Sequence, residues 1–190
     1  MTRIVAGRVK GRRLAVPAHG TRPTSERARE ALFNTLDTLL ELPGAAVLDL
    51  FAGSGAIGLE ALSRGAERVD FVENDRQAAQ VLRGNLALVA LPGGHVYQMA
   101  AATFLATTAP APATAPAPYD LAFCDPPYAL DEQQVAALLA ALCTPRWLAP
   151  GAVVVLERAA RGPQPGWPPG WDVIKHKRYG EGALWYGRAL

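Results

Sequence analysis

The chain has 190 residues, half of them hydrophobic and 19% charged, which is enough for one buried core and a small appendage. Its two cysteines and three histidines do not have the spacing of metal ligands, so we expect no metal and two reduced thiols. No apolar run approaches the roughly 18 residues of a membrane span, and the first residues lack a signal peptide's apolar segment, so we expect a cytoplasmic protein outside the membrane.

Positive charge is concentrated near the N-terminus. Residues 1–30 hold eight of the 19 Lys/Arg and two of the 17 Asp/Glu, whereas the rest of the chain is net acidic. Two short β-prone runs, Ile4–Val9 and Arg12–Val16, flank Lys10-Gly11 and predict a hairpin. A basic surface is often simply solvated, but this pattern also suits the docking of a polyanion.

A helix is predicted next, with Thr24 as its N-cap and Glu26 as a favourable residue in its first turn. Pro43-Gly44 ends the helical pattern. Apolar residues at helical spacing predict one buried face, formed by Ala28, Ala31, Leu32, Leu36, Leu39 and Leu40. We expect Arg27 and Arg29 to lie off this face, toward solvent or a ligand.

From Ala46 onward, short apolar strands alternate with amphipathic helices. Strands are predicted at Ala46–Leu50, Arg68–Val72, Val96–Met99, Tyr119–Cys124 and Ala152–Leu156. Helices are predicted at Ala56–Arg64, Asp75–Val89, Thr103–Thr107 and Glu132–Leu142. This alternation is typical of an α/β fold with a parallel sheet covered on both faces. The proline-rich run Ala109–Pro118 predicts an expanded loop, and Trp171–Tyr179 with Ala183–Arg188 predicts a terminal antiparallel hairpin.

A glycine-rich loop, Asp49 to Gly55, follows the first of these strands. Parallel sheets bind ligands at the carboxyl ends of their strands, where glycines let the backbone turn sharply. The loop lacks the Lys-Ser/Thr of a phosphate loop and matches G-x-G-x-x-G imperfectly, so a close-packed turn without a ligand stays open. The next strand ends at Glu73, twenty residues after Gly53, where a carboxylate can accept both hydroxyls of a ribose. Either Glu73 or Asp75 can instead cap the next helix; we expect Glu73 at a ribose and Asp75 at the cap.

A later strand leads into Asp125-Pro126-Pro127-Tyr128. The exocyclic amine of a nucleic-acid base is a poor nucleophile because its lone pair is delocalised into the ring, so a catalyst needs two acceptors to orient its N–H bonds. Asp125 offers a carboxylate, and the proline pair restricts the backbone so that the carbonyl of Pro126 can face a pocket. Tyr128 offers a ring for stacking the base. Asp-Pro-Pro is also a common loop breaker, but with the glycine loop and Glu73 it resembles an S-adenosylmethionine (SAM) methyltransferase acting on such an amine.

Residues 3–190 resemble one family along nearly the whole chain, the RsmD-type methyltransferases, which methylate a guanine N2 in bacterial 16S ribosomal RNA (rRNA). The N-terminal motifs narrow the resemblance to this family, whereas the core motifs belong to a broader class. The matching segments are Arg3 to Arg8, Gly11 to Leu14, Arg22 to Thr24, Arg27, Arg29 to Asn34, Asp49 to Gly55, Gly58 to Ala66, Glu73 to Asp75 and Asp125 to Tyr128.

The resemblance implies a Rossmann-like class I SAM methyltransferase fold, with a seven-stranded, mostly parallel sheet whose last strand is reversed and helices on both faces. It implies SAM as methyl donor and 16S rRNA, in an assembled or assembling small subunit, as substrate. We expect residues 1–40 to form a basic hairpin and helix that dock RNA, residues 41–190 to form the methyltransferase domain, and the protein to be a monomer.

The expected site residues fall into three groups. Catalysis is assigned to Asp125, Pro126 and Tyr128. SAM contacts are assigned to Asp49, Phe51, Ala52, Gly53, Ser54, Gly55, Glu73 and Asn74. Many relatives have a polar residue that binds adenine where this chain has the run Met99 to Thr103, so we assign the adenine contact to the backbone amide of Ala101. RNA contacts are assigned to Arg3, Arg8, Lys10, Arg12, Arg13, Arg22 and Arg27.

Three other functions remain open. The first is an amine methyltransferase on another nucleic acid, such as adenine N6 in DNA or another RNA; against DNA, the chain shows no separate target-recognition domain. The second is an NAD-binding oxidoreductase, which the imperfect dinucleotide loop and the lack of a hydride-transfer residue disfavour. The third is a non-catalytic RNA-binding module, which has no need of an intact acceptor turn.

Overall fold

The computed structural model describes residues 2–17, 25–107 and 118–189. The expected N-cap Thr24, the expected RNA contact Arg22 and nearly all of the proline-rich loop lie outside these ranges.

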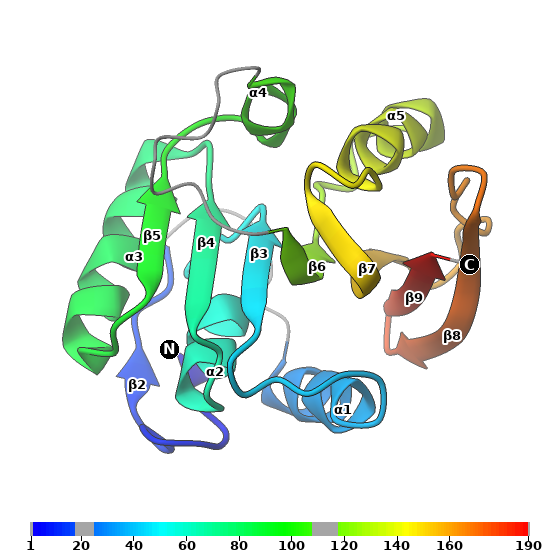
Figure 1. The fold of residues 1–190 in the computed structure, drawn as a ribbon. Coiled ribbons are helices and arrows are strands. Elements are labelled where there is room, and N and C mark those ends of the chain that lie inside the picture. The colour runs from blue at the N-terminus through cyan, green and yellow to red at the C-terminus, as the bar shows by residue number, and fades with distance from the viewer. Residues whose placement is uncertain (1, 18–24, 108–117, 190) are drawn as a thin grey trace.

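A seven-stranded sheet forms the centre of the molecule, with neighbouring strands in the order β5-β4-β3-β6-β7-β9-β8 (Figure 1). The strands are β3 (Ala46–Leu50), β4 (Arg68–Val72), β5 (Gly94–Tyr97), β6 (Tyr119–Cys124), β7 (Leu148–Ala159), β8 (Trp171–Tyr179) and β9 (Gly182–Ala189). β3 to β7 are paired in parallel, and β9 runs antiparallel to both of its neighbours. The class I methyltransferase fold, with the last strand reversed, is confirmed.

Helices cover both faces of this sheet. On one face, α1 (Glu26–Leu36), α2 (Ala56–Ser63) and α3 (Arg76–Val89) pack on alternate strand residues such as Val47, Phe123 and Val155. On the other face, α4 (Ala101–Ala106) and α5 (Glu132–Leu142) pack on the residues between, such as Leu48 and Cys124. This alternation follows from the two-residue period of a strand, and it explains why the central strands are apolar throughout.

Several boundaries differ from the prediction for local reasons. β5 begins two residues earlier than expected, because Gly94 already pairs with Val69 of β4. α1 is capped by Ser25, whose side chain accepts from the backbone N of Ala28 at 3.2 Å. The helix ends at Leu36, and the chain continues in tight turns from Thr35 to Thr38 and from Leu36 to Leu39.

The basic arm, defined here as residues 2–17, does not form the predicted hairpin of the runs Ile4–Val9 and Arg12–Val16. Its β pairing is limited to β1 (Thr2–Arg3) with β2 (Arg13–Leu14). Between them the backbone turns to α2: the amides of Val5 and Ala6 donate to the carboxylate of Glu60 at 2.7 and 2.9 Å. The prediction failed because the hydrogen-bond partners of this segment come from a helix far away in sequence.

The closest approach of the arm to α2 is at Gly7, where φ is +82°. A Cβ atom at this position would lie 2.0 Å from the carbonyl oxygen of Ser63. The hydroxyl of Ser63 accepts from the amide of Val9 at 3.2 Å and donates to the carbonyl of Ala6 at 2.6 Å. Glycine is therefore required for the arm to lie against the end of α2.

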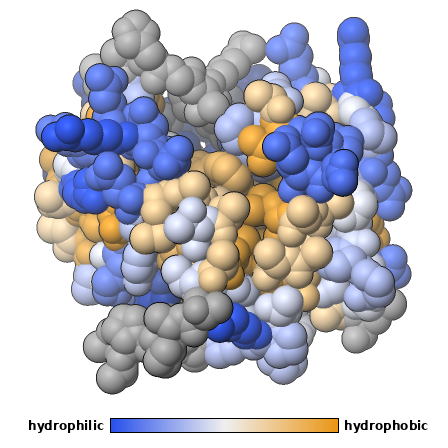
Figure 2. Space-filling view, turned by 90° about the horizontal axis from the view of Figure 1, so that it is seen from above, coloured by the Kyte–Doolittle hydropathy of each residue, from blue (hydrophilic) through white to orange (hydrophobic). Residues whose placement is uncertain are grey.

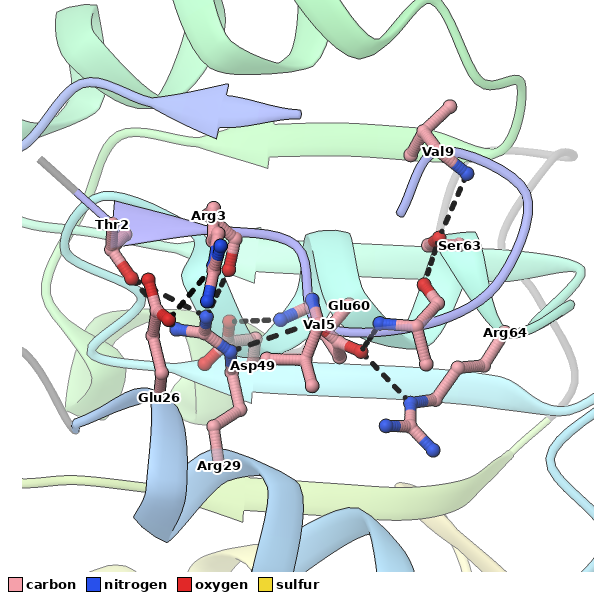
Figure 3. Close-up of polar contacts among 12 residues, drawn as sticks. Thr2, Arg3, Val5, Val9, Glu26, Arg29, Asp49, Glu60, Ser63 and Arg64 are labelled. Atoms are coloured by element: carbon pink, nitrogen blue, oxygen red, sulfur yellow. Dashed lines mark hydrogen bonds and ion pairs between the residues drawn. The ribbon is translucent and has the colours of Figure 1, made fainter. Parts of the chain in front are cut away.

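A buried ion pair holds the start of the arm (Figure 3). The side chains of Arg29 on α1 and Glu60 on α2 are both 0% exposed, with Arg29 Nε 3.6 Å from Glu60 Oε2. Arg29 also donates to the hydroxyl of Thr2 at 3.3 Å and to the carbonyl of Arg3. The expectation that Arg29 faces solvent or a ligand is wrong, because its charge is needed to pair with Glu60 inside the protein.

The arm also contributes to the main core. Ile4 and Leu14 are 1% and 0% exposed and belong to the same apolar cluster as α1, α2 and one face of the sheet.

None of the helices in the described part of the chain is both long and apolar enough to cross a membrane.

Candidate active site at the carboxyl ends of the strands

The glycine loop connects β3 to α2 through three residues with positive φ. Phe51, Gly53 and Gly55 have φ values of 65°, 55° and 79°. At Gly55 a Cβ atom would lie 2.1 Å from Leu82 Cδ1 of α3, so the position is restricted by packing as well as by conformation. The loop is pinned to the next strand by the amide of Ala52, which donates to the carbonyl of Val72 at 3.0 Å.

Asp49 lies under this loop with 2% of its surface exposed. Its Oδ2 accepts from the amide of Gly58 in α2 at 3.0 Å (Figure 3). Burial raises the pKa of Asp49 to about 7, the Gly58 hydrogen bond opposes this, and the charge of Glu73 adds to it. Asp49 therefore fixes the start of α2 relative to β3 and can change its charge near neutral pH.

Glu73 joins the loop to the end of β4. Its Oε2 accepts from the amide of Gly53 at 2.7 Å, and its Oε1 accepts from the amide of Asp75 at 2.7 Å. Each carboxylate oxygen has a second lone pair, so the side chain can accept two further hydrogen bonds from a ligand. The expected cap is confirmed: the side chain of Asp75 accepts from the amide of Ala78 at 2.8 Å at the start of α3.

These elements surround a cavity of about 1060 Å³. This volume suits a small-molecule ligand. Viewed from above, apolar residues gather at the middle of the molecule, with hydrophilic residues to either side (Figure 2). Most of the expected SAM contacts line the cavity, namely Asp49, Phe51, Ala52, Gly53, Ser54, Glu73, Asn74 and the buried Ala101. Gly55 does not line it, because this residue packs behind the loop against α3.

The acceptor turn reaches the same cavity from β6. Asp125 and Pro127 line the cavity, Pro126 between them is buried, and Tyr128 is 59% exposed. A turn closes at Pro127, whose carbonyl accepts from the amide of Leu130 at 2.9 Å. Asp125 and Glu73 thus face one space although they are 52 positions apart in the sequence.

Asp125 lies among other acidic groups. Burial, together with the charges of Glu157 and Asp49, raises its pKa to about 8 against the opposing charge of Arg158. Glu157 lies in β7 directly after Leu156, which pairs with Cys124 at the end of β6, so the two acids lie at neighbouring positions of two parallel strands. A carboxylate in this position can take up a proton near neutral pH.

Several residues that shape this site were not predicted from the sequence. Arg158 on β7 donates to the carbonyl of Leu130 at 2.9 Å and to Glu132 at 2.8 Å, which holds the segment after the acceptor turn. Val16 and Pro17 at the end of the arm line the cavity. Asn85 of α3 is 2% exposed and contacts both the arm and the glycine loop. Asn85 has helical spacing to the buried residues Leu82 and Val89. This spacing could have predicted from the sequence that Asn85 lies on the buried face of α3.

Most of the basic residues of the arm lie on the surface. Arg3, Arg8, Lys10, Arg12 and Arg13 are exposed, as is Arg27 at the start of α1. Arg3 also pairs with Glu26, with Nε 2.9 Å from Oε2. The described residues contain no cluster of three or more metal-ligating side chains.

A model of the family Conserved hypothetical protein 95 matches residues 2–188. The chain belongs to this family. It is the RsmD family that the N-terminal motifs indicated, and the match extends over nearly all the described residues.

Two curated relatives carry the name Ribosomal RNA small subunit methyltransferase D. The protein from Escherichia coli K12 is 37% identical over 182 residues, covering 94% of this chain and 85% of the relative. The protein from Haemophilus influenzae is 35% identical over 181 residues, covering 94% and 89%.

Solved structures agree with the fold. The E. coli protein yhhF has a TM-score of 0.85 at 34% identity, covering 99% of this chain and 97% of that one. The magnesium protoporphyrin IX methyltransferase of Synechocystis PCC 6803, solved with bound SAM, has a TM-score of 0.65 at 13% identity, which shows a shared fold alone.

Proposed function

We propose that this protein is a SAM-dependent methyltransferase that modifies the N2 amine of a guanine in 16S rRNA. The observation that carries the proposal is one cavity lined by both the glycine loop with Glu73 and the acidic acceptor residue Asp125. The names of the curated relatives support rRNA of the small subunit as the substrate class.

The residues at the glycine loop fit SAM. Glu73 has two lone pairs left for the ribose hydroxyls after it has accepted from Gly53 and Asp75. Phe51, Gly53 and Ser54 form the wall beside it, and Ala101, which also lines the cavity, offers a backbone amide for the adenine. Asp49 lies beneath the loop and orients it through Gly58.

Asp125 has the chemistry of an amine acceptor site. Its carboxylate accepts a hydrogen bond from the target amine and directs the nitrogen lone pair toward the cofactor. Bound SAM would supply an electrophilic methyl group, with its sulfonium sulfur as the leaving group. The nitrogen then loses one proton, which Asp125 accepts because burial raises its pKa to about 8. Pro126 supplies the second acceptor through its carbonyl, and the exposed ring of Tyr128 stacks on the base.

The basic arm and the exposed start of α1 bind the RNA backbone. We assign phosphate contacts to Arg3, Arg8, Lys10, Arg12, Arg13 and Arg27, all exposed, and to Arg22. Residues 1–40 then act as the docking unit and residues 41–190 as the catalytic unit of a monomer. Contacts to phosphate carry little sequence information, so selection of the guanine falls to the acceptor pocket and to the shape of the ribosomal particle.

The test is transfer of a labelled methyl group to naked 16S rRNA, to small subunits and to double-stranded DNA, with the modified base identified by mass spectrometry. We expect N2-methylguanine in 16S rRNA. Asp125→Ala removes both the hydrogen-bond acceptor and the proton acceptor, so it should abolish transfer while calorimetry shows SAM binding retained. Label in DNA, or N6-methyladenine, would support the alternative amine methyltransferase. Binding of NAD in place of SAM would support an oxidoreductase.

A further inference from the structure

Asn85 of α3 joins two segments that are distant in the sequence. Its Nδ2 donates to the carbonyl of Ala15 in the arm and to the carbonyl of Ser54 in the glycine loop, each at 2.9 Å. Its Oδ1 accepts from the amide of Ala15 at 2.9 Å. The side chain is 2% exposed, so both N–H groups and the oxygen are used inside the protein. Such a set fixes the distance between the arm and the loop.

Both of these segments contribute to the wall of the cavity. Ser54 lines it from the glycine loop, and Val16 and Pro17, which directly follow Ala15, line it from the arm. The exposed basic residues of the arm lie earlier in the same segment, ending at Arg13. The exposed basic residues of the arm therefore lie within a few residues of the cavity wall and of the hydrogen bonds from Asn85 to the loop.

Among the residues that the structure describes, the other polar contacts that hold the arm do not reach the loop. Glu60 and Ser63 bind it at the middle and end of α2, and Arg29 binds its first residues. Within the described ranges, Asn85 is the side chain whose hydrogen bonds join the arm to the glycine loop.

We propose that Asn85 is a positioning residue that couples the arm to the cofactor cavity. The inference rests on the proposed function, since it names how the RNA-docking and SAM-binding parts of that site communicate. RNA bound to the arm favours the arrangement of Ala15 and Ser54 in which the cavity accepts SAM. By thermodynamic reciprocity, bound SAM strengthens RNA binding by the same factor.

Asn85→Asp tests the bridge with little change in shape. The remaining oxygen can still accept from the amide of Ala15, but an oxygen replaces Nδ2 and faces the carbonyls of Ala15 and Ser54. Ser63→Ala is the control. It removes two hydrogen bonds between α2 and the arm and touches no atom of the glycine loop. A purely structural weakening of the arm would appear in both variants.

The measurement is the SAM dissociation constant of the full chain by calorimetry, with and without saturating 16S rRNA. In the wild type, RNA should tighten SAM binding roughly fivefold or more. In Asn85→Asp this ratio should fall to about one, whereas Ser63→Ala should keep the wild-type ratio even if its melting temperature falls. An unchanged ratio in Asn85→Asp, or a ratio of one in a wild type that binds SAM, overturns the coupling. A wild type that binds no SAM overturns the proposed function instead.

Hydrogen exchange provides a second measurement that needs no variant. Because the amide of Ala15 donates to Asn85, SAM should slow its exchange in the wild type, while the amide of Val9, which donates to Ser63, should change less. Equal protection factors at Ala15 with and without SAM would contradict the proposal even if Asn85→Asp does not fold.

Discussion

Replacing Glu60 with alanine should destabilise the protein by about 3–5 kcal/mol, because removing one partner of a buried ion pair leaves the other charge without compensation. The side chain of Arg29 is 0% exposed and would be left without the carboxylate 3.6 Å away. The amides of Val5 and Ala6 would also lose their acceptor. For a domain of this size, a loss of 1 kcal/mol lowers the melting temperature by about 2–4 °C, so the midpoint should fall by roughly 6–20 °C.

Thermal unfolding followed by circular dichroism, with urea unfolding at 25 °C, measures the loss. Adding Arg29→Met to Glu60→Ala should recover part of it, because no buried charge is then left. Glu60→Gln, which keeps the shape but not the charge, should fall between wild type and Glu60→Ala. A melting temperature for Glu60→Ala within about 2 °C of wild type would refute the argument that this pair holds the arm.

Three further outcomes are expected at the cavity and the loop. Glu73→Ala should weaken SAM binding roughly ten- to hundred-fold in calorimetry, because a hydrogen bond to a charged group contributes about 1.5–3 kcal/mol; unchanged affinity would remove Glu73 from the site. The value of kcat/KM should rise with pH through about 8, because Asp125 must be ionised to accept from the amine. The unfolding free energy should fall as pH rises from about 4 to about 8 and then level off, because folding raises the pKa values of Asp49 and Asp125 from 3.8 to about 7 and about 8. A flat kcat/KM profile, or a stability that grows with pH over this range, would contradict this. Gly58→Ala should lower the melting temperature, since its Cβ would lie 2.2 Å from the ring of Phe71, and a wild-type melting temperature would show that α2 can shift to make room.

The sheet was predicted well because each central strand can be recognised from its own residues. β3, β4 and β6 have the predicted bounds, and α5 begins and ends where its apolar spacing indicated. These strands are buried on both faces, so each is a short continuous apolar run between turns, and little else in a chain of this composition produces that pattern.

The arm was predicted poorly because its structure depends on distant residues. Its backbone amides donate to the side chains of Glu60 and Ser63, about 55 positions away. The β propensity of a short segment contains no information about such distant partners. Arg29 is a different case. It has helical spacing to Leu32, Phe33 and Leu36, which are all buried, but its charge was taken to mean exposure. A charged residue on an apolar face is better interpreted as a sign of a buried partner.

The candidate site was predicted in its parts but not in its assembly. The glycine loop, Glu73 and Asp125 each follow a strand, and parallel strands bring such residues to one edge. The contributions of Val16, Pro17 and Asn85 were missed, because they depend on the path of the arm across α3, which follows from tertiary packing.

The place of β9 in the sheet has a consequence for how the protein is made. β9 is the strand furthest along the chain, yet it lies between β7 and β8 and is the neighbour of both. During synthesis β8 therefore emerges before the strand that joins it to the rest of the sheet exists, and β7 has one open edge until residues 182–189 follow. The part of the chain that carries the glycine loop and the acceptor turn is complete by then, while Leu184 and Tyr186 of β9 still have to enter the core. The sheet is thus completed when β9 pairs with the edge of β7, and until then this edge is open to pairing with other segments.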